Sequence, residues 1–391
     1  MISLCTDYGY LSLIKKGEEL CGDHVEVVEN DGDTLVMVLA DGLGSGVKAN
    51  ILSILTSKIL STMLSSGVDI ATCLNTVVKT LPVCEVRKIA YSTFTVVRIT
   101  NNRDAELIQY DNPKLILLRN GKNLDYPTTE LTIDGKKILT SNIHLELDDV
   151  LVSMSDGAIY AGVGELMNFG WQRDNIIEYL EKRYNRDYSA KTISSILIDK
   201  CNSLYAGQPG DDTTICTIKI RERKQVNLLV GPAVDPKDDI KMMTLFFSKK
   251  GKHIVCGGTT SKIASKYLHK QIDLTLDDFI DPEIPPIAKI EGVDLVTEGV
   301  ITLSRVLEYS EDYLAKNERY IEWSYKSDGA SQITRLLFEE ATDIDFYVGR
   351  AMNPAHQNPD LPISFSIKMR LIENLSANLK KMGKKIKVSY F

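Results

Sequence analysis

The order of strand-like and helix-like stretches changes at a charged run in the middle of the chain, residues 221–225 (Arg-Glu-Arg-Lys-Gln). Before this run, apolar stretches typical of strands come in blocks, with helix-like stretches in pairs between them. After it, the two kinds alternate. Blocks of strands indicate antiparallel sheets, whereas strand–helix repeats indicate a parallel sheet with helices on its faces. A chain of 391 residues also exceeds what one core usually supports. The sequence therefore predicts an α+β domain at residues 1–222 and an α/β, Rossmann-like domain at residues 226–391.

The individual elements follow from the period of the apolar residues. In the first half, strands are predicted at residues 35–40, 92–99, 105–110, 114–119, 150–154 and 213–220, and helices at 47–65, 69–81, 171–184 and 190–204. In the second half, strands are predicted at 226–230, 253–256, 294–296, 345–348 and 386–390, and helices at 237–247, 261–268, 303–314, 330–340 and 367–381. Residues 278–286, which carry several prolines, are predicted to form a loop.

Composition argues against nucleic-acid and membrane partners. The net charge is 46 − 53 = −7, and phosphate backbones are bound by clustered Lys and Arg. The sequence has no apolar run of about 18 residues and no basic segment leading into an apolar one at its start. Its seven cysteines are scattered and never spaced as Cys-x-x-Cys, as expected for reduced thiols. These features predict a cytoplasmic protein that binds neither nucleic acid nor membrane.

Acidic residues stand at the polar ends of the predicted strands. Asp41 directly follows the strand at 35–40, and Asp156 follows the strand at 150–154. Asp211 and Asp212 precede the strand at 213–220, and Asp23 precedes an alternating run. Hard divalent cations bind several carboxylate oxygens gathered from different elements. Together these positions predict a shared metal centre.

Each position also has a simpler explanation. Asp41 could cap a helix, since Asp is a favoured N-cap, although the helical period begins only at Val47. Asp156 is followed by Gly157, which suits a type I turn. Several such sites in one domain favour the metal centre over separate caps and turns. Oxygen ligands suit Mg²⁺ or Mn²⁺, and two such ions about 3.5–4 Å apart can assist phosphoryl chemistry.

Four ordered motifs resemble the metal-dependent serine/threonine phosphatases of the type 2C (PPM) superfamily, in the branch of the stage II sporulation phosphatase SpoIIE. They are Gly22-Asp23, Asp41-Gly-Leu-Gly-Ser-Gly46, Ser155-Asp-Gly157 and Gly210-Asp-Asp-Thr-Thr214, and the resemblance covers about residues 15–221. It implies a sandwich of two antiparallel sheets with helices outside, and the metals at one end. It also implies hydrolysis of phosphoserine or phosphothreonine, for example in an anti-sigma-antagonist-type protein.

The resemblance also implies roles for single residues. Asp41 would bridge two Mn²⁺ or Mg²⁺ ions, one of them also bound by the carbonyl of Gly42, and the bridging hydroxide would attack the phosphate. Asp156 and Asp211 would hold the second ion, and Asp23 would bind directly or through water. Asp41, Asp156 and Asp211 are thus the predicted catalytic residues. No basic residue stands out as a phosphate clamp, although Arg87 or Lys88 could act as one, and His24 is expected to have a surface or packing role rather than to transfer a proton.

Two alternatives to a protein phosphatase stay open at this point. The domain could be a catalytically silent binding protein that keeps the fold, or it could act on a small phosphorylated metabolite. In the second half, glycines follow three predicted strands, at Gly231, Gly257 and Gly299. Carboxyl ends of parallel strands are where such sheets bind ligands, so a small phosphate-bearing ligand is predicted there. The alternative is a tight turn in which Thr260 or Ser261 caps the following helix.

Overall fold

The structure is a computed structural model, and it describes residues 3–30, 34–80, 92–133, 136–164, 166–274, 287–351 and 363–391. The chain divides into two compact units, Met1–Glu222 and Arg223–Phe391, which meet within the charged run at 221–225. We describe each unit by itself.

The first unit contains two antiparallel sheets. The first sheet has five strands in the order β1-β11-β10-β6-β7, and the second has six in the order β2-β3-β4-β5-β9-β8. The strands of the first sheet are β1 (Leu4–Leu13), β6 (Ile116–Arg119), β7 (Lys122–Asn123), β10 (Val150–Met154) and β11 (Thr213–Glu222). Those of the second are β2 (Asp23–Asn30), β3 (Thr34–Gly42), β4 (Ser92–Thr100), β5 (Asp104–Tyr110), β8 (Thr129–Ile133) and β9 (Lys136–His144).

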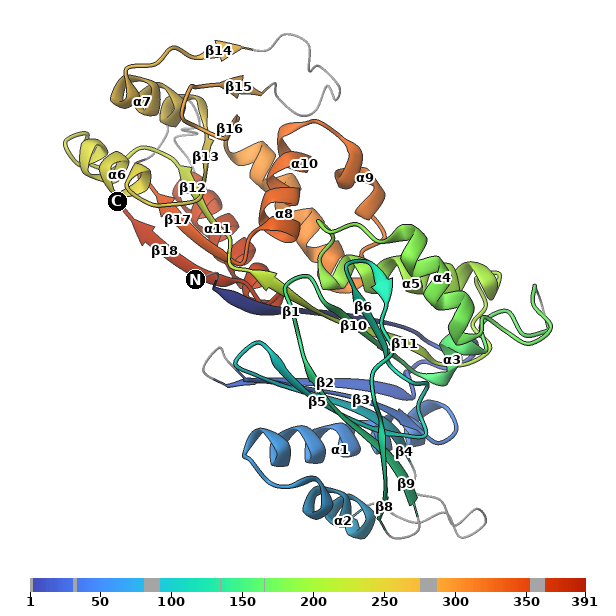
Figure 1. The fold of residues 1–391 in the computed structure, drawn as a ribbon. Coiled ribbons are helices and arrows are strands. Elements are labelled where there is room, and N and C mark those ends of the chain that lie inside the picture. Colours follow the sequence, from blue (N-terminus) through green and yellow to red (C-terminus); the bar gives the residue numbers. More distant parts are fainter. Residues whose placement is uncertain are drawn as a thin grey trace. The chain divides into compact units, whose positions relative to one another are not determined.

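Helices cover the outer faces of both sheets (Figure 1). The pair α1 (Gly46–Ser65) and α2 (Ile70–Thr80) lies on the second sheet, and the pair α4 (Arg173–Arg183) and α5 (Ala190–Leu204) lies on the first. A single-turn helix, α3 (Asp156–Ile159), follows β10. The predicted α–β–β–α sandwich of antiparallel sheets is confirmed.

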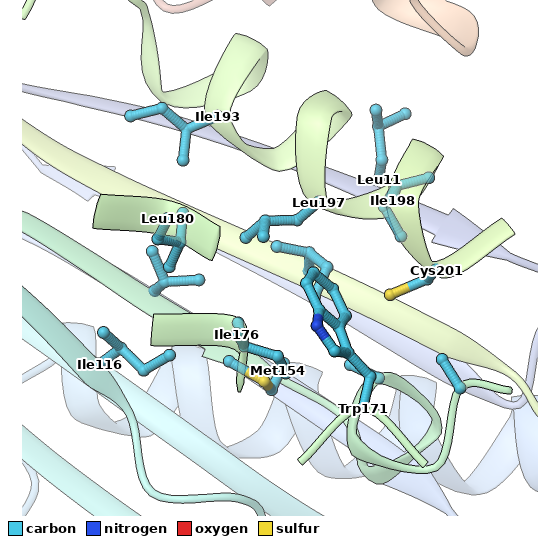
Figure 2. Packing of buried hydrophobic residues seen from close by; sticks show 14 of the residues in the cluster. Leu11, Ile116, Met154, Trp171, Ile176, Leu180, Ile193, Leu197, Ile198 and Cys201 are labelled. Carbon is cyan, nitrogen blue, oxygen red and sulfur yellow. The ribbon is translucent and has the colours of Figure 1, made fainter. Parts of the chain in front are cut away.

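Three apolar layers hold this sandwich together, and β3 contributes to two of them. Its side chains alternate: Met37 and Leu39 belong to the core between the sheets, whereas Val36 and Val38 belong to the core beneath α1 and α2. Strand side chains point to opposite faces, so a strand covered on both faces is apolar throughout. The third core lies between the first sheet and α4 and α5, with Trp171 at its centre (Figure 2).

The second unit is built on a seven-stranded sheet in the order β14-β15-β16-β13-β12-β17-β18. Its strands are β12 (Gln225–Val230), β13 (Lys252–Cys256), β14 (Asp273–Leu274), β15 (Ala288–Lys289), β16 (Leu295–Thr297), β17 (Asp343–Val348) and β18 (Lys385–Tyr390). Five neighbouring strands, β16, β13, β12, β17 and β18, pair in parallel. Strands β14 and β15 extend the β16 edge of the sheet in antiparallel pairing. The predicted, mostly parallel sheet is confirmed.

Taken in chain order, the parallel strands stand as 3-2-1-4-5, the arrangement of doubly wound folds, with the reversal between β12 and β17. The helices are α6 (Asp238–Phe247), α7 (Gly258–Leu268), α8 (Val300–Ala315), α9 (Tyr320–Tyr325), α10 (Gly329–Thr334), α11 (Ile363–Lys381) and a π-helix (Arg335–Glu340). Phe246 of α6 anchors the core beneath α6 and α7, and α8 packs against α10 and α11.

A few local predictions need correction. The helix predicted at 330–340 is α10 followed by a π-helix, and α7 begins three residues earlier than predicted. The sequence period does not predict strands β1, β7, β8, β9, β14 and β15. The loop predicted at 278–286 lies outside the described residues. No helix in the described ranges combines the length and apolarity needed to cross a membrane.

Candidate metal centre

The second sheet brings Asp23 and Asp41 together. Asp23 begins β2 and Asp41 lies near the end of β3, and the antiparallel register sets these two residues directly opposite each other. Residues facing each other in this way have Cβ atoms about 4.5–5.5 Å apart, and like charges there repel. The pair therefore needs a proton or a cation between its carboxylates.

The first sheet supplies the other acidic residues. Asp156 follows β10, and Asp211 and Asp212 precede β11, the antiparallel neighbour of β10. The backbone N–H of Ser155 donates to the carbonyl of Thr214 at 3.0 Å, which keeps the two strand ends adjacent. The predicted acidic residues of this sheet are thus gathered at one end of it.

A hydroxyl joins the two sheets at this end. The Oγ atom of Ser155 donates to Oδ2 of Asp23 at 2.7 Å and accepts the backbone N–H of Thr214 at 2.8 Å. Ser155 thereby fixes the Asp23 carboxylate of the second sheet to the strand ends of the first. The sequence prediction included Ser155 in a motif but gave it no role.

Glycines permit the close packing around the acidic residues. A Cβ atom at Gly42 would collide with the backbone of Ala49 in α1, and one at Gly157 would collide with the carbonyl of Asp212. A Cβ atom at Gly22 would lie 2.8 Å from Oδ2 of Asp212. The glycines predicted beside the acidic residues therefore let backbone approach backbone and carboxylate.

Electrostatics show that the carboxylates act on one another. Burial, with the charges of Asp23, Asp156 and Asp211, raises the pKa of Asp41 to about 9. Burial, with the charges of Asp212 and Asp156, raises the pKa of Asp23 to about 7 despite the hydrogen bond from Ser155. Burial and the charge of Asp211 also raise the pKa of Asp156. We call Asp23, Asp41, Asp156, Asp211 and Asp212 the acidic cluster.

The donor atoms of the acidic cluster fit a hard divalent cation. Oδ1 of Asp23 and Oδ2 of Asp212 are buried without a hydrogen-bond partner, an arrangement that costs stability unless a donor or cation satisfies them. All five side chains offer carboxylate oxygens, as Mg²⁺ and Mn²⁺ prefer. Among the described residues, no three His, Cys, Asp or Glu side chains already stand in ligand positions.

Two charged residues near the acidic cluster were not singled out from the sequence. The ammonium of Lys15 lies 3.4 Å from Oδ1 of Asp211, and the backbone N–H of Lys15 donates to Oδ1 of Asp212 at 3.0 Å. Asp111 adds a negative charge that raises the pKa of Asp156 further. Lys15 lies in the loop after β1, a strand that the sequence period did not reveal.

The alternatives raised from the sequence have mixed outcomes. Helix α1 begins after Ser45, so Asp41 does not cap it. The ring of His24 lies against α1, with Nδ1 2.8 Å from Oγ of Ser57. Arg87 and Lys88 lie outside the described residues.

Polar groups at the carboxyl ends of the parallel strands in the second unit mostly bond to their own chain. The Oγ1 atom of Thr260 accepts the backbone N–H of Gly231 at 3.0 Å, and Ser261 donates to the carbonyl of Gly257 at 2.9 Å. The N-cap of α7 is Gly257, so neither Thr260 nor Ser261 caps this helix. Oε2 of Glu298 is buried at this edge without a hydrogen-bond partner.

Comparison with known proteins gives the first unit a family. Residues 31–221 match the family Stage II sporulation protein E (SpoIIE). None of the curated proteins matches the sequence. The match ends at residue 221, so the second unit lies outside it.

Solved structures similar to this chain cover a little more than half of it. The phosphatase domain of SpoIIE from Bacillus subtilis is 20% identical, with 57% of this chain and 95% of that chain covered and a TM-score of 0.44. RsbX in complex with magnesium is 22% identical, with 56% and 100% covered and a TM-score of 0.41. The RsbU and RsbW domains of a Mycobacterium tuberculosis protein are 17% identical, with 56% and 63% covered and a TM-score of 0.43. Residues 31–221 belong to the SpoIIE family of PP2C-type phosphatase domains.

Proposed function

We propose that the first unit is a serine/threonine protein phosphatase that depends on divalent cations. The observation that carries this proposal is the acidic cluster, in which carboxylates from both sheets raise one another's pKa and leave two buried oxygens unpartnered. Ionised carboxylates this close repel one another, and bound protons or a bound cation relieve that repulsion. Membership of the SpoIIE family makes phosphoserine and phosphothreonine the expected substrates.

The proposed ligands are the ones predicted from the motifs. Asp41, Asp156, Asp211 and Asp23 would hold two Mn²⁺ or Mg²⁺ ions, with the carbonyl of Gly42 as a further ligand. A related protein, RsbX, has been solved with magnesium, which supports this choice. When bound, the ions supply a more acidic water and positive charge for the phosphoryl oxygens.

The remaining residues position these groups. Ser155 holds the Asp23 carboxylate and links the two sheets, so the spacing between ligands from different sheets depends on it. Gly42 lets α1 pack against the strand that carries Asp41. Lys15 brings a positive charge to the edge of the acidic cluster, where a phosphate group would enter.

For the rest of the chain we propose a division of labour. Residues 1–222 would act as the phosphatase domain, and residues 226–391 would form a separate domain that regulates it. An anti-sigma-antagonist-type phosphoprotein is the proposed substrate. The phosphate-bearing ligand of the second domain stays a prediction. The carboxylate of Glu298 lies at the edge where that ligand is expected, and a carboxylate repels phosphate. The cytoplasmic location also stays a prediction.

The test is hydrolysis of p-nitrophenyl phosphate and of a phosphoserine peptide by the full chain, with Mn²⁺, with Mg²⁺ and with EDTA. We expect turnover only with a cation, and its loss in Asp41→Asn. Asp104→Asn is the matched control, because Asp104 is exposed and lies far from Asp41 along the same sheet. Asp104 faces Thr100 at one end of β4, whereas Asp41 faces Thr93 near the other end.

The same assay separates the alternatives. Folded protein that hydrolyses nothing with any cation would favour a binding protein with the phosphatase fold. Faster turnover of small phosphorylated metabolites than of the phosphopeptide would favour a metabolite phosphatase.

A further inference from the structure

The loop between β1 and β2 contacts the acidic cluster on two sides, near Asp211 and Asp212 and near Asp41. On one side, Lys15 contacts Asp211 through its side chain and Asp212 through its backbone. On the other side, Oε1 of Glu18 accepts the hydroxyl of Ser45, in the glycine-rich loop after Asp41, at 2.8 Å. One short loop thus contacts the segment before β11 and the segment after β3.

The backbone of this loop is held independently of the Lys15 ammonium. The N–H of Lys15 donates to Asp212, and the N–H of Lys16 donates to the carbonyl of Pro209 at 2.8 Å. A further hydrogen bond runs from the N–H of Glu18 to the carbonyl of Lys15 at 3.0 Å. The Lys15 side chain can therefore leave Asp211 without any movement of the backbone.

The ion pair itself is weak and open to exchange. Its N–O distance is 3.4 Å, and the side chains of Lys15 and Asp211 are 36% and 42% exposed. Exposed pairs of this kind contribute little and are screened by salt. A divalent cation has twice the charge of an ammonium and orders no long side chain when it binds, so it can replace the ammonium at Asp211.

We propose that Lys15 is an exchangeable counter-ion of the metal centre. In the cation-free protein its ammonium neutralises Asp211, and a divalent cation must displace it to bind there. The displaced ammonium then stays on the fixed loop at the edge of the site, where it can pair with a phosphate group. This proposal rests on the proposed function, because it takes Asp211 as a ligand of the cation.

Two variants with the same loss of charge test the exchange. Lys15→Met removes the competing ammonium. Lys16→Met, the control, removes a neighbouring ammonium that bonds to the amide oxygen of Gln208 rather than to a carboxylate. Lys15→Arg keeps the charge. The measurement is Mn²⁺ affinity of the full chain, from the electron paramagnetic resonance signal of free Mn²⁺, with thermal melts to check folding.

We expect Lys15→Met to bind Mn²⁺ roughly two- to fivefold more tightly than Lys16→Met, the size of one exposed ion pair. Lys15→Arg should bind no more tightly than the wild type. Equal affinities for the two Met variants, or weaker binding by Lys15→Met, would overturn the proposal.

Asp211→Asn, measured in the same way, separates this proposal from the function on which it rests. If Asp211→Asn weakens Mn²⁺ binding while the two Met variants agree, only the role of Lys15 is wrong. If Asp211→Asn binds Mn²⁺ like the wild type, Asp211 is no ligand, and both the counter-ion role and the proposed metal site fail.

Discussion

The two units differ in how far the polar groups at their strand ends are satisfied by hydrogen bonds. In the first unit, five carboxylates converge and two of their oxygens stay buried without a partner. In the second, the hydroxyls of Thr260 and Ser261 are bonded within the chain, and Asp239 accepts the backbone N–H of Ala233 at 2.9 Å. Among the described residues there, Glu298 and Thr302 each have a buried oxygen without a partner.

This contrast teaches where to look for chemistry. A fold that satisfies its own polar groups gains stability from them, whereas a cluster of repelling carboxylates loses stability until something binds. The acidic cluster therefore supports the proposal of a cation site in the first unit. At the edge of the parallel sheet, which has the strand order of ligand-binding folds, the described residues include Glu298 and Thr302 with an unsatisfied oxygen each, but no cluster of carboxylates that raise one another's pKa.

The largest expected difference is between removing a carboxylate of the acidic cluster and removing one in the second unit. Asp156→Asn should lower kcat by roughly a hundredfold or more, since charge stabilisation by a bound cation accounts for several kcal/mol. Glu298→Gln should leave hydrolysis by the first unit within twofold of the wild type, because its carboxylate lies outside the acidic cluster. Initial rates with Mn²⁺ for both variants measure this. A large loss of activity in Glu298→Gln, with none in Asp156→Asn, would mean that the essential carboxylate belongs to the second unit.

The next effect is a pH dependence of stability in EDTA. The pKa values of Asp41 and Asp23 are raised to about 9 and about 7, above the ordinary value near 4. The folded state thus holds more protons than the unfolded state between about pH 4 and pH 9, so stability should fall as pH rises through this window.

Thermal melts at several pH values check the sign. In EDTA the Tm should decrease from about pH 5 to about pH 8, with a shallower slope in Asp41→Asn, which cannot ionise there. Added Mn²⁺ should raise the Tm more at the higher pH, because the cation competes with protons for the carboxylates. Equal slopes in the two proteins would mean that Asp41 does not titrate in this range.

The smallest effects are expected from one hydroxyl in each unit. Ser155→Ala removes two buried hydrogen bonds and Thr260→Val removes one, and each substitution should destabilise the protein by about 1–3 kcal/mol. Only Ser155→Ala should also weaken Mn²⁺ binding, since its hydroxyl holds Asp23. Urea unfolding with Mn²⁺ titration distinguishes the two. Similar Mn²⁺ affinities would reduce Ser155 to a purely structural residue.

The sequence by itself determined the fold class of both units and most of the acidic cluster. Apolar periods of two and of about 3.6 residues mark buried strands and amphipathic helices locally, so elements such as β10 and α5 were predicted at their observed bounds. The Asp-Gly pattern at Asp41 and Asp156 is equally local. The apolar period does not reveal strand β8, because β8 is largely exposed and lacks a buried face.

Tertiary structure alone decided which atoms meet. The register that sets Asp23 opposite Asp41 depends on the pairing of whole strands, since a slip of one residue would turn every side chain to the other face. The bond from Ser155 to Asp23 joins residues 132 positions apart, and the ion pair of Lys15 joins residues 196 apart. No local pattern records such contacts, because they arise only when two sheets, each satisfied by its own hydrogen bonds, pack through a shared apolar core.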